Sequence, residues 1–257
     1  MRDRDSGLRL ADVLVETVDT LTDDFDLGRY LRWLADRCVE LLGVRGAGVM
    51  YTGGGSEVLI AAGGRQPRAV RQLLEIQHLG GPCVESFGSG EPVAPVRIDS
   101  RGAGARWPAF AERACRYGIA ETYAVPIRRH DTVLGALNVF VAARPAVGAE
   151  SGPASDLGVG IAQALANAAA TGLHNHRTHF ACRVLSEQLQ TALDSRIRVE
   201  QAKGILAERW QTGMDEAFEA MRSHARREQQ VVDLVAAQVI KGLIDAEALR
   251  HGRSGPI

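Results

Sequence analysis

Long apolar runs are missing from this sequence. Nowhere do about 18 consecutive apolar residues occur, and the first 21 residues mix acidic side chains with short apolar stretches. Such a sequence predicts neither a membrane-spanning helix nor an export signal. Cysteine is scarce too, and Cys38, Cys83, Cys115 and Cys182 form no C-x-x-C pair and no zinc spacing with histidine. We therefore expect a protein of the reducing cytoplasm that makes no membrane contact.

Catalytic signatures are also missing. The sequence contains no G-x-S-x-G, P-loop, H-E-x-x-H or dinucleotide-binding glycine motif, and no pair of carboxylates stands out. His174, His176 and His179 are close in sequence, but on one helix the first two point about 200° apart. We expect them to be surface histidines. The sequence thus predicts no enzyme and no metal site, and it identifies no cofactor.

A net charge of one sign is absent as well. The formal net charge is −1, and residues 181–257 contain eleven basic and eleven acidic side chains. Charge alone therefore does not indicate a nucleic-acid partner, although a local basic patch would be compatible with one. The candidate basic residues fall on or near two expected helices: Arg196, Lys203, Arg209, Arg222, Arg226 and Arg227. The alternative to a nucleic-acid site is that these side chains form an ordinary solvated face.

The remaining composition is that of a globular protein long enough for two domains, with 257 residues of which 46% are hydrophobic and 24% charged. Periodicity predicts helices over 8–21, 27–42, 67–78 and 107–117, with a short helical turn around Val84 and Phe87 that ends at Gly88. The predicted strands are 44–52, 57–62, 92–98, 119–127 and 132–141, and a loop is expected over 142–155.

The last predicted strand is apolar on both faces. Alternation places Val133, Leu137, Val139 and Val141 on one side, and Leu134, Ala136 and Phe140 on the other, with Asn138 as the polar exception. We therefore expect a sheet covered by helices on both faces. The first domain is predicted to be α+β.

After this domain the pattern is entirely helical. A helix over 156–170 is expected to run on to Trp210, with Gly172 as its weak point. Two shorter helices follow, one beginning near Asp215-Glu216 and one running from Val231 to Lys241-Gly242, which gives a three-helix bundle on a coiled-coil stem. One apolar stripe follows the long helix: Leu185, Leu189, Ala192, Leu193, Val199, Leu206 and Trp210. The part around Leu185 to Leu193 predicts a parallel dimer.

Three residues of the long helix do not suit a purely structural role. Arg196 and Lys203 project near the middle of the apolar stripe, so each must extend past the core or meet an anionic partner. Gly204 costs the helix about 1 kcal/mol relative to alanine. A second helix or a ligand approaching closely would explain that glycine, and so would a kink.

This region resembles the ANTAR domain of transcription antiterminators. The resemblance rests on Arg196, Gln201-Ala202-Lys203-Gly204-Ile205-Leu206, Ala217-Phe218, Arg222 and Leu234-Val235-Ala236. It implies a three-helix module that binds paired RNA stem-loops and prevents a terminator from forming. The residues expected to serve RNA binding are Arg196, Ala202, Lys203, Gly204, Arg209, Arg222 and Arg226.

The first domain resembles a GAF domain. The resemblance rests on Gly81-Pro82-Cys83, Gly90-Glu91-Pro92-Val93, Arg106-Trp107-Pro108, Val125-Pro126-Ile127 and Leu134-Gly135-Ala136-Leu137-Asn138. It implies a sensor of a small molecule or redox signal, whose ligand the sequence does not identify. We expect a GAF-like domain over 8–173, a helical stem over 174–194 and an ANTAR-like domain over 195–245.

Cys83 is the candidate residue for redox or ligand sensing. It follows Gly81-Pro82 at the start of a short helix, where free backbone N–H groups would lower a thiol pKa. The alternative, which we favour, is a buried and inert cysteine.

Two functions remain open. One is an RNA-binding antiterminator under the control of the GAF-like domain, favoured by the intact Gln201 to Leu206 segment. The other is a ligand- or redox-sensing dimeric adaptor whose C-terminal bundle binds a protein. Departures from the family pattern at Gly213, Gln229 and Val231 favour the adaptor.

Overall fold

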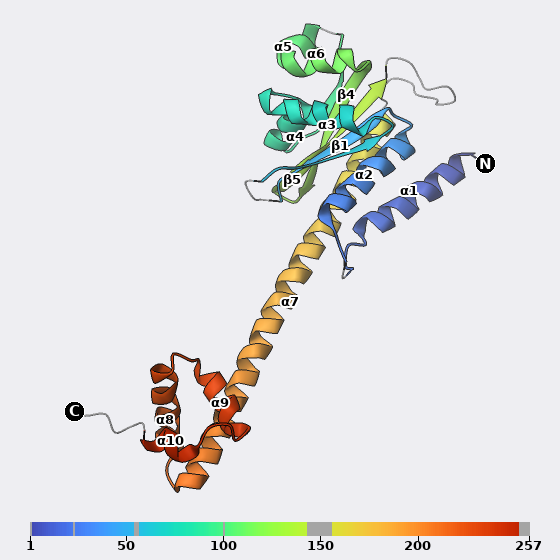
Figure 1. Ribbon diagram of the computed structural model, residues 1–257. Coiled ribbons are helices and arrows are strands. Elements are labelled where there is room, and N and C mark those ends of the chain that lie inside the picture. Colours follow the sequence, from blue (N-terminus) through green and yellow to red (C-terminus); the bar gives the residue numbers. More distant parts are fainter. Residues whose placement is uncertain (1, 23, 54–56, 100, 143–155, 252–257) are drawn as a thin grey trace. The chain divides into compact units, whose positions relative to one another are not determined.

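The computed structural model describes residues 2–22, 24–53, 57–99, 101–142 and 156–251 (Figure 1). The chain divides into two compact units, Met1–His179 and Phe180–Ile257. The helix α7, Asp156–Trp210, contributes residues to both units. The prediction that one helix continues to Trp210 is therefore confirmed.

The N-terminal unit is built on a five-stranded antiparallel sheet with the order β2-β1-β5-β4-β3. The strands are β1 Gly46–Tyr51, β2 Leu59–Gly64, β3 Val93–Arg97, β4 Ile119–Arg129 and β5 Thr132–Ala142. Both predicted hairpins form. The β4–β5 turn is tighter than predicted, because the strands pair as far as Arg129 and Thr132 and leave His130, with φ 51°, in the turn.

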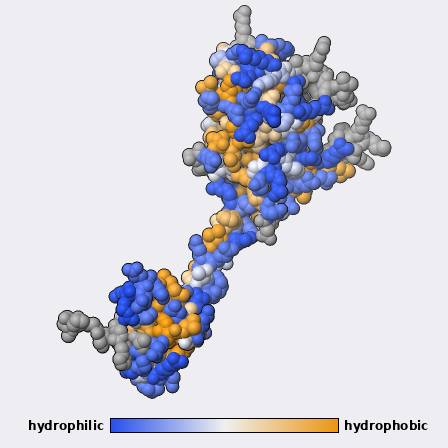
Figure 2. All heavy atoms as spheres, viewed as in Figure 1, coloured by the Kyte–Doolittle hydropathy of each residue, from blue (hydrophilic) through white to orange (hydrophobic). Residues whose placement is uncertain are grey.

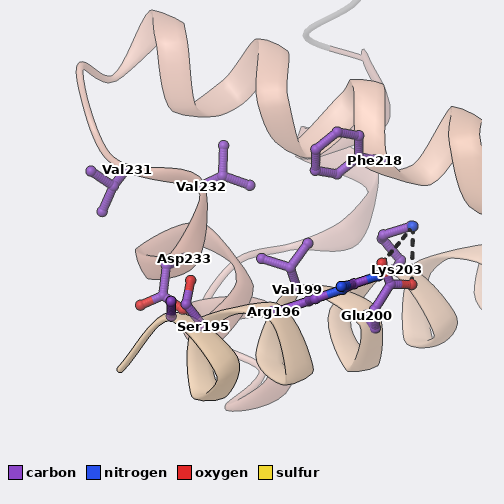
Figure 3. A pocket seen from close by; sticks show the side chains of 10 residues that line it. Ser195, Arg196, Val199, Glu200, Lys203, Phe218, Val231, Val232 and Asp233 are labelled. Atoms are coloured by element: carbon purple, nitrogen blue, oxygen red, sulfur yellow. Dashed lines mark hydrogen bonds and ion pairs between the residues drawn. The ribbon is translucent and has the colours of Figure 1, made fainter. Parts of the chain in front are cut away.

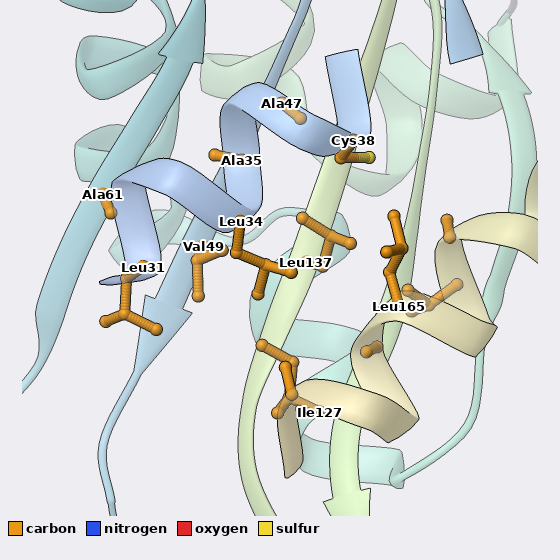
Figure 4. Close-up of a cluster of buried hydrophobic side chains, with 14 of the residues drawn as sticks. Leu31, Leu34, Ala35, Cys38, Ala47, Val49, Ala61, Ile127, Leu137 and Leu165 are labelled. Atoms are coloured by element: carbon orange, nitrogen blue, oxygen red, sulfur yellow. The ribbon is translucent and has the colours of Figure 1, made fainter. Parts of the chain in front are cut away.

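One face of the sheet is covered by α2, Leu27–Leu42, by the beginning of α7 and by α1, Arg2–Val18. Helix α2 begins where Asp26 accepts a hydrogen bond from the Arg29 N–H and ends at Gly43, whose φ is 61°. Its apolar side packs on the sheet and on α7 in a fully buried cluster (Figure 4): Leu31, Leu34, Val49, Leu137 and Leu165.

The opposite face is covered by α3 Pro67–Glu75, the 3₁₀ helix η1 Ile76–Leu79, α4 Pro82–Ser89, α5 Arg101–Arg106 and α6 Pro108–Arg116 (Figure 1). Its buried cluster includes Leu73, Leu74, Trp107, Phe110 and Phe140. The prediction of a sheet covered on both faces is confirmed. The prediction that α4 ends at Gly88 is wrong, because the helix continues to Ser89 and Gly90 adopts the left-handed conformation.

Leu134 also lies on the opposite face from the predicted one. It packs in the same buried cluster as Leu137 and Val139. The reason is a β-bulge: Ile127 pairs with Gly135 while Arg128 pairs with Val133, which leaves Leu134 as the extra residue of β5. A bulge of one residue reverses the alternation on one side of it. The prediction failed because strict alternation assumes a regular ladder.

Gly172 is not a weak point of α7 but a close packing contact. A Cβ atom there would lie 2.7 Å from the backbone oxygen of Thr17 and 3.0 Å from Cγ2 of Thr20. The Thr20 hydroxyl donates a hydrogen bond of 2.7 Å to the Gly172 carbonyl, and the Tyr30 hydroxyl donates one of 2.7 Å to the Thr17 carbonyl. Only glycine lets the α1–α2 connection approach the helix this closely.

The C-terminal unit packs the last turns of α7 against α8 Met214–Arg227, α9 Val232–Ile240 and α10 Ala246–His251. Its core contains Leu206, Trp210, Met221, Val235 and Val239. Helix α10 was not predicted, yet Leu249 is 2% exposed in this core. The predicted apolar stripe of α7 is therefore divided: its C-terminal half is buried, whereas Leu185 and Leu189 are 55% and 62% exposed. Apolar surface shows on this exposed part of α7 in Figure 2.

Candidate functional site

A groove of about 540 Å³ opens on the C-terminal unit between α7, α8 and the start of α9 (Figure 3). Arg196 and Lys203 line it from α7, and Phe218 lines it from α8. Val231 and Val232 supply the α9 side. The groove thus combines two cations with an aromatic ring and apolar walls.

Lys203 is the most enclosed cation of the groove, with a side chain 14% exposed. Its Nζ donates to both carboxylate oxygens of Glu200 at 3.0 Å and lies 5.5 Å from the centre of the Phe218 ring (Figure 3). The sequence offered two outcomes for a cation in an apolar stripe. Lys203 follows the second of these outcomes, because its ammonium meets an acidic side chain of the same helix, and it also lies over the Phe218 ring.

Arg196 differs from Lys203, since it is exposed and forms no ion pair with any described residue. Arg209 and Arg226 are likewise exposed and unpaired within the described part of the chain, but they do not line the groove. Arg222 pairs with Glu219 at 3.5 Å. Of the basic residues predicted for the site, Arg196 and Lys203 line the groove, whereas Arg209, Arg222 and Arg226 do not.

The two small residues of the predicted site have opposite surroundings. Ala202 is fully buried in the core of the unit, so direct contact with RNA does not fit its position, and its size instead suits close packing. A Cβ atom on Gly204 would have no described atom within 4 Å. Apart from the backbone of α7 itself, nothing in the described part of the chain fills the space beside that Cβ position, which leaves it open to a ligand or a second molecule.

Asp233 lines the groove and pairs with Arg198, and the sequence analysis identified neither residue. The guanidinium donates to both carboxylate oxygens, Nε to Oδ1 at 2.8 Å and Nη2 to Oδ2 at 2.7 Å. These hydrogen bonds hold the pKa of Asp233 below its usual value, and hydrogen bonding to Asp233 raises the pKa of Arg198. The Ser195 side chain, which lies beside Asp233 in Figure 3, also lowers the pKa of that carboxyl. The pair joins α9 to α7, and no local pattern links residues so far apart in sequence.

The departures from the ANTAR pattern lie at the ends of helices. Gly213 precedes α8 with φ −75° and ψ 154° and provides no side-chain cap. Gln229, in the α8–α9 connection, has φ 54°, a conformation that asparagine and glycine tolerate better than glutamine. Val231 precedes α9 and is 69% exposed. None of the three disrupts the bundle.

Cys83 is buried, as the favoured interpretation predicts, and 1% exposed. Burial raises the pKa of its thiol, so the expectation of a lowered pKa is wrong. Its N–H donates to Gln77 Oε1 at 2.7 Å, and the Gln77 amide donates to Asn138 Oδ1 at 2.8 Å. Asn138 in turn donates to Thr122 Oγ1 at 2.8 Å, so the polar exception of β5 is satisfied inside the core.

In the described ranges, no group of three or more His, Cys, Asp or Glu side chains could hold a metal ion. His176 Nδ1 lies 3.0 Å from the Thr20 carbonyl, a contact within the N-terminal unit. Over the same ranges, no helix combines the length and the apolar character that crossing a membrane requires.

Comparison with known proteins decides the family. The GAF domain model matches residues 26–173, which is more than half of the chain. The chain belongs to the GAF domain family. The ANTAR domain model matches residues 187–240, a range that contains every groove residue named above. Both resemblances drawn from the sequence are confirmed, and so is the α+β sensor fold followed by a helical module.

Solved GAF domains are similar at low identity. The GAF domain from Acinetobacter phosphoenolpyruvate-protein phosphotransferase is 15% identical, covers 67% of this chain and 96% of its own, and has a TM-score of 0.44. The GAF-B domain of DevS from Mycobacterium smegmatis is 20% identical, covers 59% and 96%, and has a TM-score of 0.39. A comparison with curated proteins finds no match.

Proposed function

We propose that this GAF–ANTAR chain is a signal-responsive transcription antitermination regulator that binds paired RNA stem-loops through its C-terminal unit. One observation carries the proposal: Arg196, Lys203 and Phe218 line one open groove inside the segment that matches the ANTAR domain. The GAF domain supplies the sensor, and its signal is an unidentified small molecule or redox change. The chain acts in the cytoplasm.

The chemistry of the groove supports an RNA partner. Unpaired bases of RNA loops stack on aromatic side chains, and backbone phosphates pair with lysine and arginine. Phe218 offers such a ring, and Arg196 offers a guanidinium that no described carboxylate neutralises. Gly204 adds a place where an RNA backbone approaches the helix without meeting a side chain. We assign Arg209, Arg222 and Arg226 to longer-range attraction of phosphates.

Pairing of stem-loops calls for two copies of the module. We propose a parallel dimer through Leu185, Leu189, Ala192 and Leu193, because three of these side chains are more than half exposed and leucine is costly to leave in water. In this proposal the functional divisions are the sensor over 8–173, the stem over 174–194 and the RNA module over 195–245. The stem then connects sensing to the spacing of two RNA modules.

In vitro transcription tests the proposal. The template carries two hexaloop hairpins that overlap a terminator, and the purified chain should increase the fraction of full-length transcript. A template with scrambled loop sequences but intact stems is the matched control and should show no increase. Equal readthrough on both templates, or no readthrough at saturating protein, would contradict the proposal.

The adaptor function has one observation in its favour. Val231, Leu234 and Leu243 are 69%, 44% and 72% exposed in the same unit, which also has no net basic charge. An apolar surface of this kind suits a protein partner. The transcription assay separates the two functions, since an adaptor has no effect on a terminator in a purified system.

A further inference from the structure

We infer that Glu200 is a specificity-determining residue that competes with RNA phosphate for Lys203. The inference rests on the proposed RNA-binding function and adds an inhibitory contact within the same groove. In this arrangement the groove binds RNA more weakly than its cations would allow on their own. The weakening acts on the phosphate contact and not on base recognition, so it is larger for RNA that lacks base contacts.

Geometry makes Glu200 the competitor. Both of its carboxylate oxygens lie 3.0 Å from Lys203 Nζ, so they occupy the positions that two phosphate oxygens would take. Lys203 is 14% exposed whereas Glu200 is 50% exposed, so the lysine is held in place and the carboxylate is free to move toward water. Both residues line the groove. A phosphate therefore reaches Lys203 only by displacing the Glu200 carboxylate or by binding beside that negative charge.

Electrostatics gives the direction of the effect. A carboxylate within about 5 Å of a bound phosphate repels it, and neutralising that carboxylate removes the repulsion at a partly enclosed site. Arg196 shows the contrasting case, because no described carboxylate pairs with it. RNA that makes base contacts gains enough to displace Glu200. RNA without base contacts depends on phosphate contacts alone, so Glu200 lowers its affinity by a larger factor.

Fluorescence titrations of the full chain with paired-hexaloop RNA and with a scrambled-loop RNA test the inference. Glu200→Gln should bind both RNAs about 3- to 10-fold more tightly than wild type, with the larger gain for the scrambled RNA. For the scrambled-loop RNA, the slope of log Kd against log salt should steepen by about 0.7 to 0.9, the value of one additional phosphate contact. For the paired RNA, which already displaces Glu200 in wild type, the slope should change little.

Two controls assign the effect to Lys203. Glu208→Gln makes the same change of charge on the same helix at an exposed carboxylate without a basic partner in the described chain, and should change Kd less than about 2-fold. In a Lys203→Met background, Glu200→Gln should also change Kd less than about 2-fold, because the contact for which it competes is gone.

The failures are distinguishable. If wild type binds the paired RNA but Glu200→Gln binds it equally or more weakly, the inference is overturned and the proposed function stands; Glu200 then orients Lys203. A gain equal to that of Glu208→Gln also overturns the inference, since it reflects net charge alone. If neither wild type nor Glu200→Gln binds either RNA, the proposed function fails and the inference fails with it.

Discussion

Arg196 and Lys203 show at the scale of single residues why a basic side chain in a sequence is not yet a binding residue. Both were predicted from their position in one apolar stripe. The structure then separates them, because Arg196 has no described ion-pair partner while Lys203 is paired with Glu200. The presence of the cations was readable from sequence, but the availability of Lys203 depends on the rotamer that brings Glu200 of the same helix to its ammonium and on Phe218 of α8.

Lys203→Met should weaken binding of paired RNA by about 10-fold and reduce the salt slope by about 1. Methionine keeps an apolar side chain of similar length on the Phe218 side of the groove, and the lost pair with half-exposed Glu200 contributes little, so the melting temperature should change little. Lys241→Met is the control, since Lys241 is the only other lysine of the sequence and lies outside the groove. Equal losses in the two variants would contradict a specific role for Lys203.

The Arg198–Asp233 pair predicts a pH dependence of the C-terminal unit. Because the folded pKa of Asp233 is lowered, the pair stabilises the fold above the unfolded pKa of about 3.9, and this contribution is lost as pH falls through the lower, folded value. The contribution is small, since the Arg198 side chain is 38% exposed and solvent screens the pair.

Hydrogen exchange of α9, corrected for the intrinsic pH dependence, measures this effect. In wild type, protection should fall in a pH-dependent step as the pH drops below the unfolded pKa of about 3.9. In Asp233→Asn, protection of α9 should be lower than in wild type at pH 6, and the pH-dependent step should be absent. An unchanged step in Asp233→Asn would assign the titration to another carboxylate.

At the scale of elements, α7 contains two glycines whose surroundings predict opposite effects. Gly172→Ala should destabilise the N-terminal unit by about 2 kcal/mol or more, because the new Cβ would meet the Thr17 backbone at 2.7 Å. Gly204→Ala should stabilise the helix by about 0.5–1 kcal/mol, since no described atom opposes it. If the RNA backbone approaches Gly204, the same change weakens RNA binding.

Thermal unfolding and an RNA titration on both variants check this pair. A Gly204→Ala protein that is more stable and binds RNA as well as wild type would show that the open space beside Gly204 is not part of the RNA site. A stable Gly172→Ala protein would contradict the close approach of the α1–α2 connection.

The exposed part of the α7 stripe predicts the oligomeric state. Leu185→Gln combined with Leu189→Gln should convert a dimer into a monomer at micromolar concentration in multi-angle light scattering. These side chains are 55% and 62% exposed, so the folded monomer should keep its helical circular dichroism. A monomeric wild-type protein under the same conditions would contradict the proposed dimer.

Most elements were predictable because their signals are local. Periodicity, Asp26 and Gly43 define α2, and two apolar strands separated by a polar turn define the β4–β5 hairpin. The failures have non-local causes. Helix α5 has the sequence RGAGAR, without apolar periodicity, and α10 is short, so tertiary packing decides both. The bulge at Leu134 depends on pairing between strands.

At the scale of the whole molecule, the proposed function has α7 carry a signal from the sensor to the RNA module. A fragment of residues 174–257 should bind paired RNA at least as tightly as the full chain, because the sensor restrains the module and does not create it. Any difference in affinity between fragment and full chain measures the restraint. The fragment lacks the Gly172 contacts but keeps the exposed stripe.

Insertions after His179 test whether the helix transmits that restraint. Each added alanine turns the helix by about 100°, so one or two should abolish the difference between full chain and fragment, and seven should nearly restore it. The site follows the last packed residues of the N-terminal unit and precedes Leu185. The same affinity for all insertion lengths would mean that the stem is only a tether.

A direct titration of RNA against the full wild-type chain tests the central claim most closely. Labelled RNA with two hexaloop hairpins is compared with the same RNA carrying one hairpin, at 0.1 M salt as a standard condition. The account predicts saturable binding of the paired hairpins, and binding of the single hairpin weaker by about 10² or more, because two linked modules act together. Equal affinity for the two RNAs, or no binding at tens of micromolar protein, would contradict it.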